Sequence, residues 1–314
     1  MRKRVSIIGA GQTGASTAQR IAERGYADVV LTDVVEGLAE GKALDLQESA
    51  PVVGFDARVS GATTTPEGAG YEATADSDVV IITSGVPRKP GMSRDDLLAI
   101  NQKIITTVVQ AVVASSPNCI LVVLTNPVDA MTQLAFRVSG FPSNRVIGQA
   151  GILDTARYKT FIALELGVSF KDISAYVLGG HGDSMVPLPG STFVGGRPLR
   201  SLLTPERIEQ IVERTRRGGE EIVRYLKTGS AFYAPSAALA EMVDAIIMDQ
   251  KRVLPCCAYL QGQYGINDLY VGVPVKLGAT GIEQIVELEL SHTELLALQG
   301  SADAVRALIE TMRI

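Results

Sequence analysis

The amino-terminal segment predicts a strand, a glycine turn, a helix and a second strand that ends in an acid. Val5 to Ile8 is a short apolar strand, and the sequence Gly-Ala-Gly-Gln-Thr-Gly follows directly at residues 9–14. A helical stretch runs to Gly25, and the apolar residues 29–32 form a second strand that ends at Asp33. Glycines also mark ordinary turns, but glycines in this context are typical of a dinucleotide-binding unit. The segment therefore constrains the chain to an open α/β sheet with a phosphate site at one edge.

Each glycine of the turn has its own expected role. Gly9 permits the tight turn, Gly11 lets the backbone approach a phosphate, and Gly14 allows close packing of the helix on the strand. Gln12 and Thr13 lie at the helix start, where N–H groups and the helix dipole favour an anion.

Asp33 is the expected ribose-binding acid. It follows the last glycine by about 20 residues, which is the spacing of such acids. A carboxylate there accepts hydrogen bonds from ribose hydroxyls and repels a 2′-phosphate. Because no arginine immediately follows Asp33, we expect NAD rather than NADP as the cofactor.

Composition limits the class of protein. The 314 residues are 46% hydrophobic, enough for about two domains, and the net charge of −5 argues against nucleic acid or an anionic membrane as a partner. No stretch reaches the roughly 18 apolar residues of a membrane helix. The three cysteines lack metal-ligand spacing and sit in apolar runs. They indicate buried thiols in a reducing cytoplasm, with no metal site.

The pattern of elements changes near the middle of the chain. In the first half, strands are expected at 57–60, 78–83 and 119–125, and helices at 38–48 and 93–115. This alternation implies a doubly wound parallel sheet of the Rossmann type. After about Ile147 come a helix at 152–166, alternating segments at 173–178 and 271–277, and a final helix at 291–312. We expect a nucleotide-binding domain over 1–147 and a mixed α+β catalytic domain over 148–314.

The chain has two histidines, and only one of them suits catalysis. His292 lies at the start of the last helix and is typical of a solvated capping turn. His181 follows an apolar strand and has glycines on both sides, which leaves room for a substrate. A histidine can exchange a proton near neutral pH, although a single histidine is more often structural.

Three other groups of polar residues could join such a site. Asp154 and Arg157 are three apart on an expected helix, either as a surface ion pair or as an orienting acid beside a substrate clamp. The loop 84–94 follows a central strand and carries Arg88, Lys89 and Arg94, which suits either a solvated surface or a lid that binds an anion. Asn126 also follows a strand, and can cap the next helix or present its amide to a ligand.

Taken together, these motifs resemble those of the lactate/malate dehydrogenase superfamily over nearly the full chain. Within it, the chain is similar to the lactate-dehydrogenase-like malate dehydrogenases of bacteria. The segments that carry the resemblance are residues 9–14, 88–94 (Arg-Lys-Pro-Gly-Met-Ser-Arg), 125–127 (Thr-Asn-Pro), 153–157 (Leu-Asp-Thr-Ala-Arg) and 179–183 (Gly-Gly-His-Gly-Asp). The chain departs from the family at Gln12-Thr13, which replaces a bulkier pair, and in a longer loop at 63–70.

The resemblance implies a role for each matching residue. His181 matches the proton donor and acceptor, and Asp154 the acid that holds the imidazole, with Asp183 as its rival. Arg157 matches the clamp on the carboxylate beside the reacting carbon, and Arg94 the residue that polarises the carbonyl. The expected cofactor contacts are Gly9, Gly11, Gln12, Thr13, Gly14, Asp33, Asn101, Leu124 and Asn126, the last also touching substrate.

Arg88 decides between the substrates that the family implies. The resemblance places this position at the far end of the substrate, where arginine pairs with the second carboxylate of oxaloacetate. We therefore expect reversible, NAD-dependent oxidation of malate to oxaloacetate by a homo-oligomer, either dimer or tetramer. A lactate dehydrogenase and a non-catalytic NAD(H)-binding protein are the alternatives.

Overall fold

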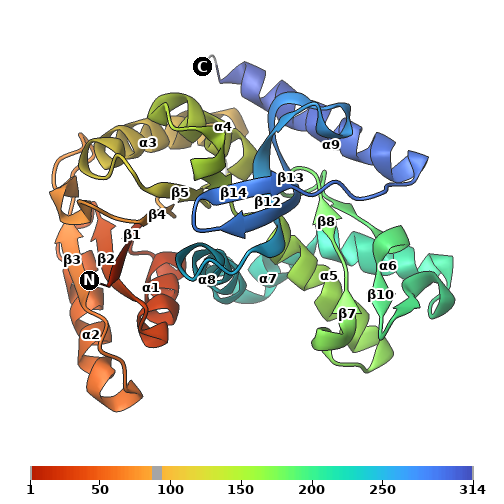
Figure 1. Cartoon of the computed structure of the whole chain (residues 1–314), viewed down its shortest axis with the longest axis horizontal. Coiled ribbons are helices and arrows are strands. Elements are labelled where there is room, and N and C mark those ends of the chain that lie inside the picture. Colours follow the sequence, from red (N-terminus) through yellow and green to blue (C-terminus); the bar gives the residue numbers. More distant parts are fainter. Residues whose placement is uncertain (1, 87–93, 313–314) are drawn as a thin grey trace.

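The computed structural model describes residues 2–86 and 94–312. Strands and helices alternate through the first half, and Figure 1 shows the helices on both faces of the sheet that the strands form. The elements of this half are β1 (Lys3–Ile8), α1 (Gln12–Arg24), β2 (Ala27–Asp33), α2 (Leu38–Val53), β3 (Val59–Thr63), β4 (Val79–Ile82), α3 (Arg94–Ser115), β5 (Ile120–Val123), α4 (Val128–Ser139) and β6 (Val146–Gly148).

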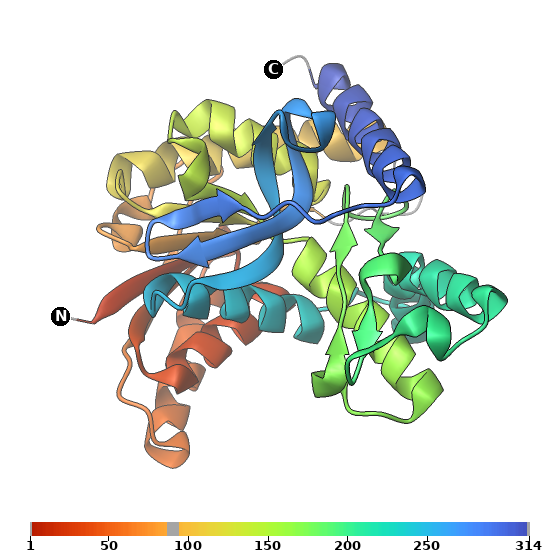
Figure 2. The same ribbon diagram turned by 45° about the vertical axis from the view of Figure 1, so that its right-hand side comes forward.

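The second half forms a lobe of short strands and helices and then returns to the sheet. Its elements are α5 (Gly151–Leu166), β7 (Ile173–Ser174), β8 (Val177–Leu178), β9 (Val186–Pro187), β10 (Phe193–Val194), β11 (Arg197–Pro198), α6 (Pro205–Arg216), α7 (Gly218–Leu226), α8 (Tyr233–Ile247), β12 (Arg252–Gln261), β13 (Asn267–Gly278), β14 (Gly281–Ile285) and α9 (His292–Thr311). Figure 2 shows this lobe, with α5 and α6, beside the sheet.

The strand order confirms the predicted doubly wound sheet. The large sheet runs β14-β13-β12-β6-β5-β4-β1-β2-β3, and the neighbours from β6 to β3 are parallel. Every residue of β4 and β5 is buried, as continuous apolar strands covered on both faces require. Helices α3 and α4 pack together on one face, and α1 packs with α8 on the other (Figure 1).

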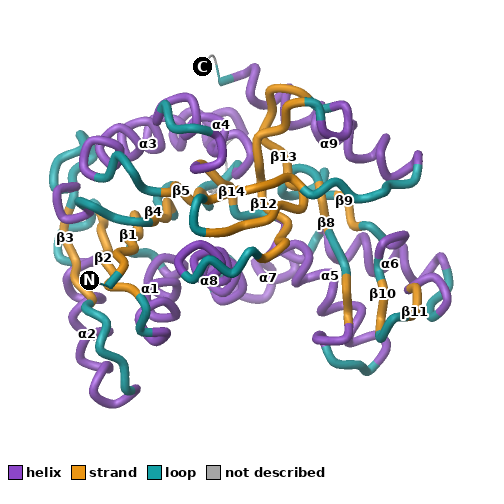
Figure 3. The backbone as a smooth tube through the Cα atoms, in the orientation of Figure 1, coloured by secondary structure: helices purple, strands orange, loops and turns teal. Residues whose placement is uncertain are grey.

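The second half adds an antiparallel extension to this sheet, which the sequence did not predict. Strand β12 joins β6 through the pair Cys257 and Gly148, and β13 and β14 continue as antiparallel hairpins (Figure 3). A Cβ at Gly148 would lie 2.7 Å from Cys257 Cβ, so the glycine permits this junction.

Several expected boundaries shift. The segment 173–178 forms two short strands, β7 and β8, rather than one. Strand β3 begins two residues later than expected, at Val59, and α2 continues past residue 48 to Val53. Asn126, which could have capped the next helix, does not do so, because the N-cap of α4 is Pro127.

One helix of the described chain is long and apolar enough to cross a membrane. It is residues 96–115 of α3, with a mean hydropathy of 1.5. The helix contains no uninterrupted apolar run of the length a membrane span needs, but its mean hydropathy is high enough to pass the test. Five of its buried apolar side chains lie in the main core: Leu98, Ile105, Val108, Val109 and Val112. This packing is typical of a core helix. Because core helices pass the same test of length and hydropathy, the test is weak evidence for a membrane span.

Candidate active site

The glycine turn has the geometry that a bound pyrophosphate requires. Gly9 has φ +104°, and a Cβ on it would lie 2.8 Å from the Ser84 nitrogen. A Cβ on Gly14 would overlap the Gly9 carbonyl oxygen, so the helix packs against the turn only because residue 14 is glycine. By contrast, a Cβ on Gly11 would meet nothing within 4 Å. The turn therefore leaves open space at the N-cap of α1, where helix N–H groups bind anions.

Asp33 lies beside this turn, as its spacing predicted. Its Oδ2 accepts a hydrogen bond of 2.7 Å from the Ala10 N–H, and its Oδ1 accepts one of 3.0 Å from Val35. Lys42 Nζ donates to the Ala10 carbonyl at 2.7 Å. The expected ribose-binding acid and the expected phosphate turn are thus held together, with the Lys42 ammonium close by.

Buried polar atoms at the same sheet edge also fit a polar ligand. Four side chains there have buried polar atoms with no hydrogen-bond partner among the described residues: Thr32, Thr64, Ser84 and Gln149. Thr32 is at the end of β2, Ser84 follows β4, and Gln149 follows β6. Buried polar atoms in proteins are nearly always paired, so these atoms are expected to have a partner outside the chain. A polar ligand such as NAD at this edge would supply one.

Asn101 and Asn126 meet between α3 and β5. The buried Asn101 side chain accepts from the Val86 N–H at 2.9 Å and donates to the Asn126 carbonyl at 2.8 Å. Asn101 therefore holds the backbone at Val86 and at Asn126 in place, and its contact with the cofactor stays a prediction. Asn126 is exposed at the strand end, and Leu124 beside it is partly buried.

The structure brings His181, Asp154 and Arg157 together. His181 Nδ1 lies 2.8 Å from Asp154 Oδ2, and Arg157 Nη1 lies 3.3 Å from Asp154 Oδ1. The Asp154 side chain is 3% exposed, which excludes the alternative of a surface ion pair. This contact leaves Nε2 as the ring nitrogen that can face a substrate. His292, as expected, is exposed at the start of α9.

Electrostatics favour a protonated imidazole. Burial lowers the pKa of His181, but the charge and hydrogen bond of Asp154 raise it by more, so the net shift is upward. Burial lowers the pKa of Arg157, against the opposing pull of Asp154. His181 and Asp154 thus form a pair whose imidazole can exchange a proton, with the Arg157 guanidinium beside it.

Helix α7 covers the Arg157 side chain, which sequence reasoning missed. A Cβ on Gly218 would lie 3.0 Å from Arg157 Cδ, and one on Gly219 would lie 3.6 Å from Arg157 Nη2. The two glycines at 218 and 219 were the only sequence signal of this approach.

Two further residues near His181 were also missed. Asp129 of α4 accepts from the His181 N–H at 2.8 Å, and Ser301 of α9 accepts from the Gly180 N–H at 2.8 Å. They lie 52 and 121 residues from their partners, so no local pattern could reveal them.

Two predicted substrate residues cannot be placed against this site. Arg88 and the side chain of Arg94 lie outside the described residues, and only the backbone of Arg94 is described, as the first residue of α3. Their roles remain predictions.

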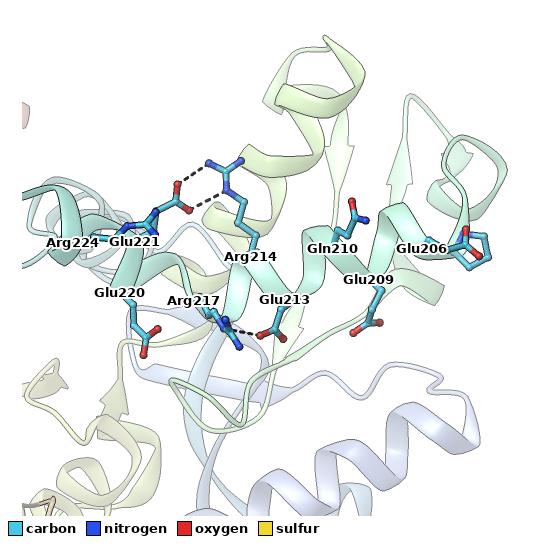
Figure 4. Close-up of a pocket in the computed structure, with 10 residues that line it drawn as sticks. Glu206, Glu209, Gln210, Glu213, Arg214, Arg217, Glu220, Glu221 and Arg224 are labelled. Atoms are coloured by element: carbon cyan, nitrogen blue, oxygen red, sulfur yellow. Dashed lines mark hydrogen bonds and ion pairs between the residues drawn. The ribbon is translucent and has the colours of Figure 1, made fainter.

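A hollow of about 1200 Å³ lies elsewhere, along α6 and α7 (Figure 4). Four of its charged side chains form two ion pairs: Arg214 with Glu221 at 2.9 Å, and Arg217 with Glu213 at 2.7 Å. Since these side chains are partly to largely exposed and His181 is not among the lining residues, the hollow is a charged surface groove apart from the candidate site.

Comparisons with known proteins agree with this geometry. Residues 3–148 match the lactate/malate dehydrogenase NAD binding domain, and residues 152–313 match the lactate/malate dehydrogenase alpha/beta C-terminal domain. The match of the first domain confirms the expectation of NAD. A malate dehydrogenase of Thermomicrobium roseum is 56% identical over 313 residues, covering 100% of this chain and 99% of the relative.

Solved structures show the same fold. The apo malate dehydrogenase of Picrophilus torridus has a TM-score of 0.96 at 46% identity and covers 100% of this chain and 98% of its own. A lactate dehydrogenase of Cryptosporidium parvum, complexed with lactic acid and nicotinamide adenine dinucleotide, has a TM-score of 0.95 at 40% identity, with 100% and 98% coverage. On these matches and on its own site residues, the chain belongs to the lactate/malate dehydrogenase family.

Proposed function

We propose that the chain interconverts malate and oxaloacetate with NAD, using His181 as the acid and base. The observation that carries this proposal is the 2.8 Å contact between His181 Nδ1 and the buried Asp154, beside Arg157. Relatives named malate dehydrogenase, at 54–57% identity over nearly the whole chain, support this function, which the sequence predicted.

The residues of this chain divide the work between binding and proton transfer. NAD, when bound, takes up or supplies the hydride. The glycine turn and Asp33 would hold its pyrophosphate and ribose, with Leu124, Asn126 and the Asn101 region nearer the reacting end. For reduction His181 must be protonated, because its Nε2 gives a proton to the carbonyl oxygen; for oxidation it must be neutral to receive one.

The arginines would orient and polarise the substrate. Arg157 has a planar, bidentate donor set suited to the carboxylate beside the reacting carbon, and fixing that group aligns the carbon for hydride transfer. Arg94 would stabilise the negative charge that develops on the carbonyl oxygen.

Arg88 would select the dicarboxylic substrate. Its guanidinium pairs with the second carboxylate of oxaloacetate, whereas pyruvate presents a methyl group. Charge-assisted hydrogen bonds of about 1.5–3 kcal/mol each correspond to a preference of roughly ten- to a few hundred-fold.

Replacement of Arg88 by glutamine tests this assignment. We expect Arg88→Gln to lower kcat/KM for oxaloacetate and to narrow or reverse its ratio to that for pyruvate, while the Kd for NADH stays unchanged. Arg200→Gln removes an exposed arginine to which no substrate role is assigned, and is a matched control that should leave the ratio as in the wild type. An unchanged ratio in Arg88→Gln would remove the basis for assigning the substrate to this residue.

The setting of the enzyme is part of the same proposal. We assign it to the cytoplasm and to the oxidation of malate in the tricarboxylic acid cycle, as a homodimer or homotetramer. We also divide it into a nucleotide-binding domain over 1–147 and a catalytic domain over 148–314. Sedimentation equilibrium would distinguish dimer from tetramer.

A further inference from the structure

The turn that carries His181 is held from behind by side chains of two other helices. Gly179 pairs with Gly272 of β13, with its N–H 2.9 Å from the Gly272 oxygen. The next two N–H groups are bound by Ser301, from α9, and by Asp129, from α4. Three consecutive residues are thus fixed through their main chain, independently of the contact between the His181 ring and Asp154.

The glycines of the turn make this close approach possible. Gly179 has φ +84°, and a Cβ on it would lie 2.6 Å from Ser301 Oγ. A Cβ on Gly180 would lie 2.7 Å from Val305 Cγ2 and 3.6 Å from Asp129 Oδ2. The glycines at 179 and 180 thus admit the supporting side chains, in addition to the room for a substrate that glycines on both sides of His181 were expected to leave.

Asp129 differs from Ser301 because it can carry a charge. It is buried, at 5% exposure, yet both of its oxygens receive hydrogen bonds: Oδ2 from the His181 N–H at 2.8 Å and Oδ1 from Cys257 Sγ at 3.2 Å. Both partners are donors, which suits a carboxylate rather than a carboxylic acid. Burial raises the pKa of the Cys257 thiol well above its usual value, so the thiol keeps its proton and stays a donor.

We propose that Asp129 is a positioning residue of the active site: its carboxylate holds the main chain of His181 and places a second negative charge behind the imidazole. This inference rests on the proposed function, because it assigns Asp129 to the same proton transfer. Asp154 acts on the ring directly, whereas Asp129 acts through the backbone and through its field.

Among the described residues, the groups around His181 come from four elements and from its own turn. Helix α5 contributes Asp154 and Arg157, α4 contributes Asp129, β12 contributes the neutral thiol of Cys257, and the turn itself contains Asp183. From α9 come Ser301 and Val305, which carry no charge. Burial raises the pKa of Asp129, opposed by the His181 N–H, and Asp129 in turn raises that of His181.

The two-histidine composition allows a direct test that needs no turnover. Labelling histidine with ¹⁵N gives signals from His181 and His292 alone, and the His292→Gln variant assigns them. In the full-length His292→Gln chain, Asp129→Asn keeps an oxygen that can accept from the His181 N–H but removes the charge. We expect it to lower the pKa of His181 by about half a unit to one unit.

Ser301→Ala is the matched control, since it removes the sister contact to Gly180 without removing a charge. We expect the pKa of His181 in this variant to stay within about 0.2 of the wild-type value, because a neutral hydroxyl adds little field. If Asp129→Asn does not fold, Asp129→Ser, which also offers an accepting oxygen, takes its place. An unchanged pKa of His181 in the neutral variant, or an equal shift in Ser301→Ala, would overturn the proposal.

Turnover measured on the same variants separates this inference from the proposed function. We expect the pH midpoint of kcat/KM for malate oxidation to move down with the pKa of His181 in Asp129→Asn, with little change in the Kd of NADH. Wild-type protein that binds NADH but fails to oxidise malate would overturn the proposed function while leaving the NMR result for Asp129 standing.

Discussion

At the residue scale, the chemistry depends on an imidazole whose environment is set by distant residues. The upward pKa shift of His181 comes from Asp154, whose contact outweighs the opposing effect of burial. Helical spacing predicts only that Asp154 and Arg157 share one face of α5, and the resemblance to the family implied their roles. The hydrogen bond from His181 to Asp129 could not be predicted, because it depends on how α4 docks against the turn.

Asp154→Asn should weaken oxaloacetate reduction by about 10²-fold or more, because general acid catalysis is lost as the imidazolium is destabilised. The raised pKa of His181 means that the reduction rate falls as pH rises through that value, while malate oxidation gains. In Asp154→Asn both midpoints should move to lower pH, as measured by kcat/KM profiles in each direction.

Glu165→Gln is a matched control for this change. Glu165 lies on the same helix but pairs with Arg207 on the surface, 2.6 Å away. We expect its pH profile to follow the wild type. Identical profiles for Asp154→Asn and the wild type would contradict the role of Asp154.

At the scale of elements, the expectations that succeed depend on local sequence, and those that fail depend on tertiary packing. The glycine turn was predictable because each glycine answers a local steric demand. The short strands β7 and β8 were not, because the alternating residues 173–178 do not reveal that they pair with different sheets. The approach of α7 to Arg157 likewise depends on the tertiary packing of that helix.

The glycine turn gives a pair of variants with opposite expected effects. Gly14→Ala places a methyl group against the Gly9 carbonyl, so we expect a loss of about 1–3 kcal/mol in the free energy of unfolding together with loss of NADH binding. Gly11→Ala meets no protein atom, so its melting temperature should stay near that of the wild type while NADH affinity drops about tenfold or more.

Differential scanning fluorimetry and NADH fluorescence titration measure both quantities. Equal loss of stability in the two variants would contradict the open space at Gly11. Unchanged NADH affinity in Gly11→Ala would show that the cofactor does not occupy this space.

Helix α7 provides a separate test of the substrate clamp. We expect Gly218→Ala to push the Arg157 side chain aside and raise the KM for oxaloacetate several-fold, with the Kd of NADH unchanged. Gly300→Ala is a suitable control, because Gly300 lies in α9 and a Cβ there would have open space around it. Gly229→Ala is not, because the φ of +83° at Gly229 would strain any other residue. A KM equal to that of the control would contradict the contact.

At the scale of the whole molecule, the two halves share both a sheet and a helix interface. Helix α8 of the second half packs on α1 of the first, where Asp244 accepts from Tyr26 at 2.6 Å and pairs with Arg24 at 2.9 Å. The sequence predicted the class of fold of each half. The antiparallel strands that extend the first sheet could be found only from the assembled fold.

Asp244→Ala should therefore destabilise the molecule as a unit. Because it leaves the partly buried Tyr26 hydroxyl and Arg24 without this partner, we expect a loss of about 1–3 kcal/mol in a urea titration. Glu241→Ala, on the same helix, breaks an exposed pair with Arg252 and should cost under about 1 kcal/mol. Equal costs for the two variants would count against Asp244 as the link between the halves.

The most direct test of the central claim is the turnover of His181→Asn with oxaloacetate and NADH. Asparagine cannot exchange a proton near neutral pH, so kcat should fall by about 10²–10⁴-fold while the Kd for NADH stays near the wild-type value. A variant that binds NADH normally and turns over oxaloacetate at the wild-type rate would contradict the assignment of proton transfer to His181.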